Sequence, residues 1–276
     1  MNVTTATVLI AFAVVPTLAA NDARAAPFLP DFEAATFVSG APINNPYFPL
    51  LDKKTRVFVG ETPAERFELT VLGAGPIILG VQTTARRDRS FEDGLLVEDT
   101  FDYYAQDSIG NVWYFGEDVT NFHYDDEGNL IGTDSESAWR AGINGALPGY
   151  IMPVDLTVGF NYYQEFAVLD EALDQGLTFA AGQIVSIAIG EFSDVLQVLE
   201  TSELEPDARE FKYYAPGVGL ILVEEDLDAN FQNPESTFEL AATIPEGGTL
   251  ALLGLGLSGM FAIRTRSRVG TYRTSS

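Results

Sequence analysis

Short runs in which apolar and polar residues alternate are the feature that most constrains how this chain can fold. Between residues 66 and 71 every second side chain is apolar, which is the period of a half-buried β-strand. Residues 95–106 also sort into two faces at this period. Signals for tight turns separate such runs, and they are Asp93-Gly94, Gly110-Asn111, Glu127-Gly128-Asn129 and Pro216-Gly217.

Strand-like segments continue to residue 225, with turn signals about every 8–12 residues. Strands do not alternate with helices, as they would in a parallel sheet. The sequence therefore predicts an all-β, mainly antiparallel fold, which could be a meander, a sandwich or an open barrel. Residues 169–175 could add one or two helical turns. The chain ends are expected to add a signal helix and a transmembrane helix.

The N-terminus has the pattern of a secretory signal peptide over residues 1–25. An apolar run from Val8 to Ala19 has the length of the hydrophobic region of such peptides. Ala23-Arg24-Ala25 supplies a cleavage site. Export is therefore expected. The chain contains no cysteine, so it can form neither disulfide bonds nor thiolate metal sites.

The chain is strongly acidic, with a formal net charge of −25. Residues 26–246 hold 39 acidic and 10 basic side chains, a formal charge of −29. A field of this sign disfavours nucleic acid and anionic lipid headgroups as partners. It suits solubility, high-salt surroundings or divalent cations.

Composition divides the chain into segments. Residues 26–44 are rich in proline and alanine and are interpreted as a linker. Residues 45–225 are predicted to form the β-rich domain. The polar and acidic residues 226–243 are interpreted as a spacer that leads to a C-terminal tail, residues 244–276.

The tail has three parts. Ile244-Pro245-Glu246-Gly247 is followed by a short apolar helix, predicted over residues 248–263, and then by an arginine cluster within residues 264–268. Spanning a bilayer takes about 20 apolar residues, so this helix would be a marginal, temporary anchor. Basic residues beside a span stay in the cytoplasm, which places the acidic body on the far side. The arginines that set this orientation are Arg264, Arg266 and Arg268. The alternative is a buried core helix with a basic end.

The tail resembles the PEP-CTERM sorting signal of exported bacterial proteins. The resemblance rests on the Ile244-Pro245-Glu246-Gly247 motif, the apolar stretch from residue 249 to 257 and the arginines. Glycine stands where the family has its second proline. A tail of the Gly-Gly type, cut by a rhomboid-like protease, is the nearest competitor. The resemblance implies an exosortase-like membrane protease as partner, a transient stay in the inner membrane with the C-terminus cytoplasmic, and then release or attachment at the cell surface. Such tails are often found in organisms that make exopolysaccharide.

The body also resembles a group of exported bacterial β-domains to which no activity is assigned. The stretches that carry this resemblance are residues 45–50, 104–107, 110–116 and 212–220. They imply no substrate.

No catalytic constellation is evident in the sequence. His123 is the only histidine, and we expect it to be a strand-surface residue rather than part of a Ser-His-Asp arrangement. With 40 acidic residues, some pair of carboxylates would always be available for glycoside cleavage. Arg86, Arg87 and Arg89 are expected to pair with acids on the solvent face.

Calcium is the one cofactor for which the sequence offers candidates. Asp125, Glu127 and Asn129 could supply oxygen ligands, although their spacing is not that of an EF-hand loop. Several aromatic residues could stack on sugar rings, but core packing explains them equally well. These residues are Tyr104, Trp113, Tyr162, Tyr163 and Tyr214.

Three functional hypotheses follow. The first is an exported, surface-sorted, non-enzymatic β-domain with a structural role or a role in binding extracellular polymer, with exopolysaccharide as a partner. The second is a secreted hydrolase that acts on polysaccharide through two carboxylates. The third is a carrier of an apolar ligand, which would need a large apolar cavity.

Overall fold

The computed structural model describes residues 26–245, which belong to one compact unit. The predicted signal peptide, the membrane helix, the arginine cluster, and Glu246 and Gly247 of the sorting motif lie outside the described residues. Within the described range, no helix is long and apolar enough to cross a membrane.

The described chain is almost entirely β-structure, as predicted. A single 3₁₀ turn, η1 (Phe32–Ala34), is its only helical element. The helical turns that the sequence allowed at residues 169–175 are absent there, because this segment forms turns and enters a strand. The strands are β1 (Lys54–Val59), β2 (Arg66–Ile78), β3 (Val81–Glu92), β4 (Leu95–Gln106), β5 (Val112–Tyr124), β6 (Leu130–Asp134), β7 (Trp139–Arg140), β8 (Leu147–Met152), β9 (Asn161–Tyr163), β10 (Glu165–Phe166), β11 (Asp174–Ile187), β12 (Gly190–Ser202), β13 (Arg209–Ala215), β14 (Gly219–Glu225) and β15 (Ser236–Pro245).

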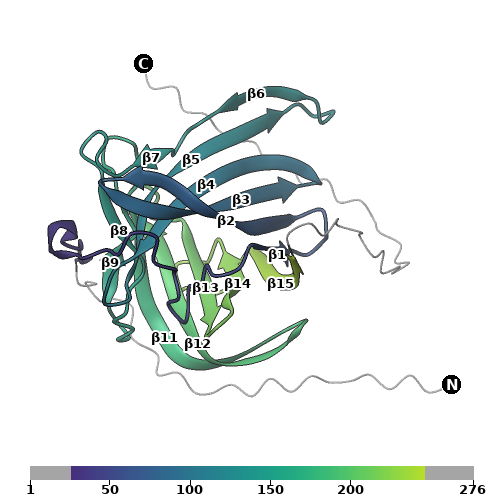
Figure 1. Cartoon of the computed structure of the whole chain (residues 1–276). Helices are drawn as coiled ribbons and strands as arrows, with labels where there is room; N and C mark the ends of the chain where they lie inside the picture. Colours follow the sequence, from purple (N-terminus) through teal and green to yellow (C-terminus); the bar gives the residue numbers. More distant parts are fainter. Residues whose placement is uncertain (1–25, 246–276) are drawn as a thin grey trace. The chain divides into compact units, whose positions relative to one another are not determined.

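The strands form one antiparallel sheet with the order β10-β8-β5-β4-β3-β2-β1-β15-β14-β13-β12-β11-β9, and β6 and β7 pair with β5. The sheet curves strongly, so that β2 to β5 and β11 to β14 lie on opposite sides (Figure 1). Its end strands, β9 and β10, are separated along the chain only by Gln164, whose backbone N–H donates to the carbonyl of Asp174 on β11 over 2.8 Å. We call this junction the seam. Of the three predicted all-β architectures, the nearly closed barrel is therefore observed.

Turn chemistry explains the register of the long hairpins. Asp93 and Gly94 link β3 to β4 with φ angles of 51° and 81°, the positive pair that a tight hairpin turn of type I′ requires. Leu79 and Gly80 link β2 to β3 in the same way, with φ angles of 49° and 81°. The second turn gave no signal in the sequence because leucine rarely adopts a positive φ.

The N-terminal arm is not the linker that the sequence indicated. Phe32 and Phe37 pack edge-on against Trp113 and Phe115 of β5, with ring centroids 5.7–6.0 Å apart. Ile43 has only 1% of its surface exposed. Proline-rich composition indicated a linker, but these apolar side chains cover a sheet face that would otherwise contact water.

The interpretation of residues 226–243 as an acidic spacer is also wrong. β15 (Ser236–Pro245) begins within this segment and lies between β1 and β14 in the middle of the sheet. Lys54 pairs with Pro245 and Thr55 with Ile244, so the first half of the sorting motif belongs to the folded domain. The alternation of Phe238 and Leu240 with polar residues marks this strand, but the acids before it gave the segment the composition of a spacer.

Candidate functional site

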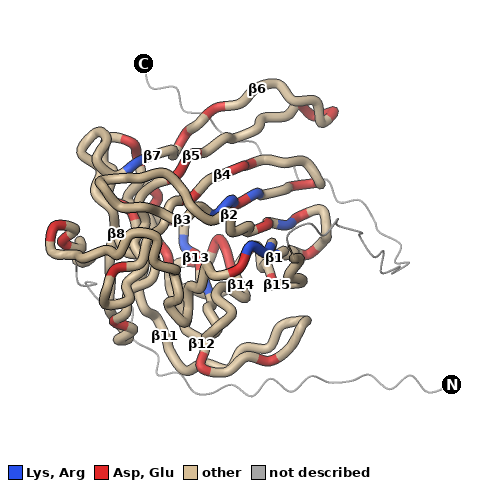
Figure 2. Tube along the Cα trace, viewed as in Figure 1, with Lys and Arg blue, Asp and Glu red and all other residues tan. Residues whose placement is uncertain are grey.

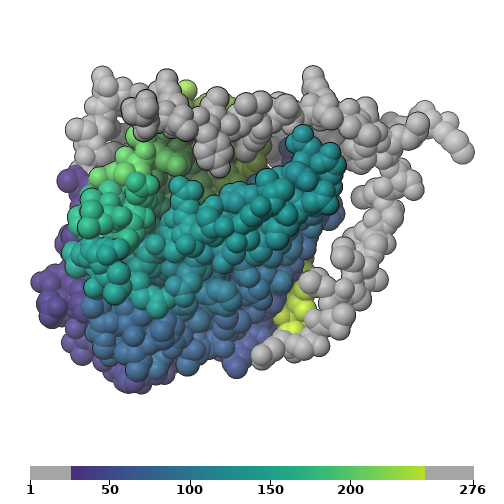
Figure 3. All heavy atoms as spheres, turned by 90° about the horizontal axis from the view of Figure 1, so that it is seen from above, coloured from purple at the N-terminus to yellow at the C-terminus, as the bar shows by residue number. Residues whose placement is uncertain are grey.

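The curved sheet encloses a polar cavity of about 1650 Å³ between its two halves. Residues of β2 to β5 line one side, and residues of β10 to β13 line the other. In the space-filling view the teal surface of β5 to β8 forms the near rim, and the green surface of later strands lies behind it (Figure 3). Fifteen aspartates and glutamates but only four lysines and arginines line the cavity. It therefore carries a strongly negative field.

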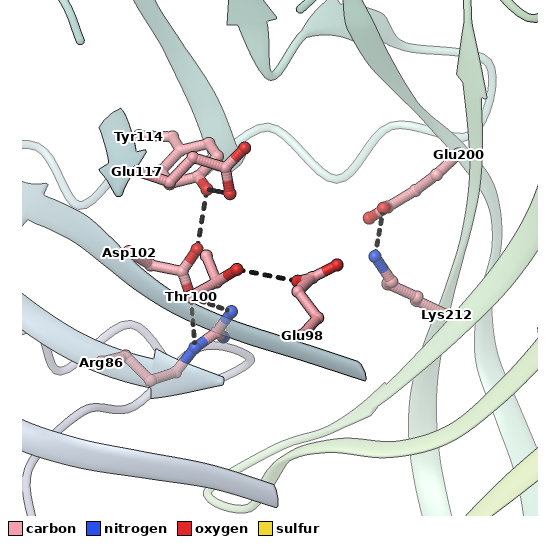
Figure 4. Close-up of polar contacts among 8 residues, drawn as sticks. All are labelled: Arg86, Glu98, Thr100, Asp102, Tyr114, Glu117, Glu200 and Lys212. Carbon is pink, nitrogen blue, oxygen red and sulfur yellow. Dashed lines mark hydrogen bonds and ion pairs between the residues drawn. The ribbon is translucent and has the colours of Figure 1, made fainter. Parts of the chain in front are cut away.

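Arg86 and Asp102 form the central ion pair on the β3–β4 side. Nε and Nη2 of Arg86 donate to Oδ2 of Asp102 over 3.1 and 2.8 Å (Figure 4). The two residues are register partners on neighbouring strands, and Asp102 is 4% exposed. Charge-assisted hydrogen bonds of this kind are about twice as strong as those between neutral groups.

Tyr114 connects this pair to a second carboxyl group. Its hydroxyl lies 2.7 Å from Oδ1 of Asp102 and 2.8 Å from Oε2 of Glu117 (Figure 4). A phenol has one proton to donate, so one of the two carboxyl groups must carry a proton of its own. Because Asp102 is already paired with Arg86, we assign this proton to Glu117. Burial, and then the nearby charge of Asp102, raises the pKa of Glu117 to about 8, in agreement with this assignment.

A second ion pair faces the first from β12 and β13. Nζ of Lys212 lies 2.5 Å from Oε2 of Glu200 and 2.9 Å from Oε1 of Glu210. Glu200 also accepts a hydrogen bond from Nε2 of Gln164 over 2.8 Å. Burial lowers the pKa of Lys212, but Glu200 and Glu210 outweigh it and hold that pKa well above its usual value. Lys212 is therefore a cation shared by two acids.

Three acids at the seam have no such cation. Glu117, Glu165 and Asp174, from β5, β10 and β11, all line the cavity, and we call them the acidic trio. Glu165 is nine-tenths buried. Among residues 26–245 none of the three forms an ion pair with a lysine or arginine. Burial, and then the charges of Glu117 and Asp174, raises the pKa of Glu165 well above its usual value.

Asp88 is a fourth acid that lacks a full set of partners. Its Oδ1 is buried and has no hydrogen-bond partner among the described residues, although Asp88 lines the cavity. Burial raises its pKa to about 7. The cavity wall therefore contains one carboxylate oxygen that no group of the described chain satisfies.

The basic residues are unevenly distributed (Figure 2). They concentrate on β1 to β3, whereas acidic residues occur on eleven of the fifteen strands. Arg87 pairs with Asp99 and Arg89 with Glu68, which are neighbours across strands rather than the nearby turn acids. Arg86, by contrast, points into the cavity instead of lying on the solvent face as predicted.

The other sequence candidates are placed as follows. His123 lies on β5 at the surface, with Nε2 2.5 Å from Oδ2 of Asp134, and borders the cavity. Asp125 uses its Oδ1 to accept the backbone N–H groups of Glu127 and Asn129 and so closes the β5–β6 turn. No group of three metal-ligating side chains is found within the described range. Calcium binding at this turn stays a prediction.

The aromatic residues that could stack on sugar rings differ in how deeply they are buried. Trp113, Tyr104, Tyr162 and Tyr214 are at most 3% exposed, so they pack in the core. Tyr104 and Tyr114 also border the cavity as a stacked pair with ring centroids 4.9 Å apart. Tyr163 is partly exposed and donates to Glu203 over 2.6 Å.

Sequence reasoning missed the residues that define the cavity. Glu117, Glu165, Asp174 and Glu200 have no motif around them, and they come from strands far apart in the chain. Asp102 and Thr100 lie on the polar face of β4, and their burial is visible only in the structure. A polar strand face that is buried indicates an internal polar cavity.

Comparisons with known proteins leave the function open. No protein-family model matches this chain, and no curated protein matches it significantly. One similar solved structure is a protein provisionally described as a lipoprotein from Parabacteroides distasonis, with 14% identity and a TM-score of 0.35. Another is provisionally described as an exported protein with a YmcC-like fold from Bacteroides fragilis, with 11% identity and a TM-score of 0.36. Each alignment covers 76% of this chain and 99% of the other. TM-scores this low establish neither the fold nor the role of this chain.

Proposed function

We propose that this protein is an exported, surface-sorted β-domain without catalytic activity, and that it binds an extracellular polysaccharide in the cavity between the halves of its sheet. The observation that carries the proposal is the cavity itself. It measures about 1650 Å³ and is lined by carboxylates, hydroxyls and amides. Sugars present many hydroxyls that hydrogen-bond to such groups.

The polar lining disfavours the third hypothesis, a carrier of an apolar ligand. Carrier cavities are lined mainly by apolar side chains. Here buried charged groups such as Asp102 and Glu200 point into the space (Figure 4). An apolar ligand would strip water from these groups without replacing their hydrogen bonds, which is unfavourable.

The binding role can be tested by affinity electrophoresis of the exported protein in gels that contain neutral, cationic or anionic polysaccharides. Ser90 lines the cavity and Ser108 is an exposed residue outside it. We expect at least one polysaccharide to retard the protein, and Ser90→Trp but not Ser108→Trp to abolish retardation. Circular dichroism must show that both variants are folded. Retardation that survives Ser90→Trp, or no retardation by any polysaccharide, would overturn the proposal.

The sorting part of the proposal rests on residues 1–25 and 244–276 of the sequence and has its own test. An exosortase-like protease is expected to cut near Pro245-Glu246, after the last residues of β15. Intact-mass analysis of the exported protein should then find both terminal segments removed. A full-length chain that is recovered only from the cytoplasm would contradict export and sorting.

One observation favours the polysaccharide hydrolase as a second candidate. Burial raises the pKa of Glu117 to about 8, as a general acid requires, and Glu117 shares the cavity with Asp102. Glycoside hydrolysis uses such an acid and a second carboxylate. Incubation with each bound polysaccharide, followed by an assay for new reducing ends, separates the two functions. Reducing ends that form with the wild type and not with Glu117→Gln would establish the hydrolase.

A further inference from the structure

We propose that this protein forms an amide bond between its own Lys212 and Gln164 side chains, with Glu200 as the group that moves the protons. The reaction happens once in each molecule and does not depend on polysaccharide binding. The inference begins from one buried carboxyl group that contacts both partners. Oε2 of Glu200 lies 2.5 Å from Nζ of Lys212 (Figure 4). Oε1 of Glu200 accepts a hydrogen bond from Nε2 of Gln164 over 2.8 Å.

The amine and the carboxamide are neighbours although they come from distant parts of the chain. Lys212 lies on β13, and Gln164 is the residue between β9 and β10. The carbonyl carbon of Gln164 is one amide bond, about 1.33 Å, from the nitrogen that contacts Glu200. The flexible four-carbon stem of Lys212 can bring Nζ to this carbon by rotation about its own bonds. Well-oriented intramolecular reactants can gain an effective concentration of about 10⁵ M or more.

The reaction conserves atoms and charge. The ammonium group of Lys212 gives one proton to Glu200, and the neutral amine attacks Cδ of Gln164, so that a C–N bond forms and the carbonyl oxygen becomes an oxyanion. Glu200 then passes its proton to Nε2 of Gln164, and the bond between Cδ and Nε2 breaks as the carbonyl group forms again. The linked nitrogen loses its extra proton to the departing ammonia, which leaves as ammonium. Glu200 ends as a carboxylate, and no other reactant is needed.

The first proton transfer is the slow step. Nζ of Lys212 lies between Glu200 and Glu210, at 2.5 and 2.9 Å, and these acids favour its ammonium form. A lysine must lose its proton before it can act as a nucleophile. A bond that forms once in the life of a molecule tolerates a slow step. The escape of ammonia into the solvent then makes the bond permanent.

Tyr162 provides an independent observation beside these residues. Its side chain is fully buried, and its hydroxyl has no hydrogen-bond partner among the described residues. The hydroxyl lies over Gly176, where a Cβ atom would be 2.7 Å from its oxygen. Gly176 is the register partner of Glu200, so the hydroxyl and the Glu200 side chain lie on the same face of the sheet. A buried donor without a resting partner is suited to the oxyanion that forms on Gln164.

The bond would fasten the weakest part of the sheet. β9 pairs with β11 over three residues, and β10 pairs with β8 over two. An amide bond from Gln164 to β13 would hold both short strands at the seam. The chain has no cysteine, and this cross-link needs none. Like a disulfide bond, it would stabilise the domain by restricting the unfolded chain.

The experiment is mass spectrometry of the exported protein, intact and after denaturation and digestion with trypsin. Trypsin cuts after arginine and unmodified lysine, so an unlinked chain gives residues 141–209 as one peptide and is cut after Lys212. We expect residues 141–209 to be joined to a peptide that begins at Glu210 and is uncut after Lys212. The intact mass should be lower by one ammonia molecule. Lys212→Arg should abolish both changes, and Lys53→Arg, at an exposed lysine, should keep them.

Two further variants test the mechanism, with the linked fraction measured at intervals after synthesis. Glu200→Gln keeps a hydrogen-bonding side chain but cannot carry the protons, and it should slow bond formation roughly a hundredfold or more. Tyr162→Phe removes the oxyanion donor and should slow bond formation roughly a hundredfold. Circular dichroism must show that both variants are folded.

Every other outcome decides against a part of the proposal. Wild-type protein of unmodified mass that is cut after Lys212 would overturn it entirely. Loss of a water molecule instead of ammonia would place the bond on a glutamate and overturn the role of Gln164. Bond formation at the wild-type rate in Glu200→Gln or in Tyr162→Phe would overturn the role of the residue replaced. None of these results bears on polysaccharide binding, which affinity electrophoresis tests separately.

Discussion

Arg86 donates to Asp102 through two nitrogens, 3.1 and 2.8 Å from the same carboxylate oxygen, and the side chains of Arg86 and Asp102 are only 15% and 6% exposed. This contact joins β3 to β4. The other carboxylate oxygen of Asp102 lies 2.7 Å from the hydroxyl of Tyr114, which also contacts Glu117. Much of the chemistry of the cavity thus depends on this ion pair.

Asp102→Asn should strongly destabilise the domain. The substitution leaves the guanidinium group of Arg86 buried without its counter-charge, which typically costs about 3–5 kcal/mol. The double variant Arg86→Met with Asp102→Leu should lose less stability than Asp102→Asn alone, since it removes both charges. Urea unfolding of the three proteins measures these differences. A single variant as stable as the wild type would show that the pair is not buried in solution.

Stability should fall as the pH rises through neutrality. The pKa of Glu117 is about 8 in the folded state and near its ordinary value of 4.5 when unfolded. Between these values the folded state holds a proton that the unfolded state has lost, so raising the pH favours unfolding. Asp88 and Glu210, whose pKa values burial raises to about 7, act in the same direction. Thermal unfolding should occur at a lower temperature at pH 8 than at pH 5.

Glu117→Gln tests whether Glu117 is protonated in the folded protein and so contributes to the loss of stability at higher pH. A glutamine amide is neutral and can donate to the Tyr114 hydroxyl as a protonated carboxyl group does. The variant should therefore match the wild type at pH 5 and be more stable by roughly 3 kcal/mol at pH 8. Glu61→Gln, which is exposed, serves as the control and should change neither value. A uniform loss of stability at both pH values would show that Glu117 is ionised in the folded protein.

Two similar turns should respond very differently to loss of their aspartate. Asp107, after β4, accepts backbone N–H groups of the turn and also the indole N–H of buried Trp113 over 2.9 Å. Asp107→Ala leaves these buried donors unsatisfied and should cost about 3 kcal/mol. Asp125 closes an exposed turn, where water can replace it, so Asp125→Ala should cost less than about 1 kcal/mol. Equal losses in chemical denaturation would contradict this reasoning.

The domain should require residues beyond 225. A chain of residues 26–247 keeps β15 between β1 and β14, whereas a chain of residues 26–225 leaves both strands with an unpaired edge. It also removes Leu240 from a buried cluster that contains Phe58. The longer chain should show a cooperative thermal transition, and the shorter one should aggregate or lack it. A stable, monomeric short chain would restore the spacer interpretation.

Local patterns in the sequence were sufficient to predict the fold class. The alternation at residues 66–71 and the Asp93-Gly94 turn depend only on neighbouring residues, and both correspond to observed structure. The sequence patterns gave a wrong prediction where a segment is stabilised mainly by contacts with residues far away in the chain. Composition indicated a linker at residues 26–44 and a spacer at 226–243, yet Phe37 and Leu240 bury apolar surface against strands far away in the chain.

The sequence by itself determined that the protein is antiparallel and acidic, and that it can form no disulfide bonds, because these properties follow from residue identity and local period. Only the tertiary structure decided which acidic residues line the cavity. Sheet closure brings Glu117, Glu165 and Asp174 from three separate strands to one buried seam. A carboxyl group is a solvated charge on an isolated strand. Inside the closed sheet, loss of water and mutual repulsion raise its pKa.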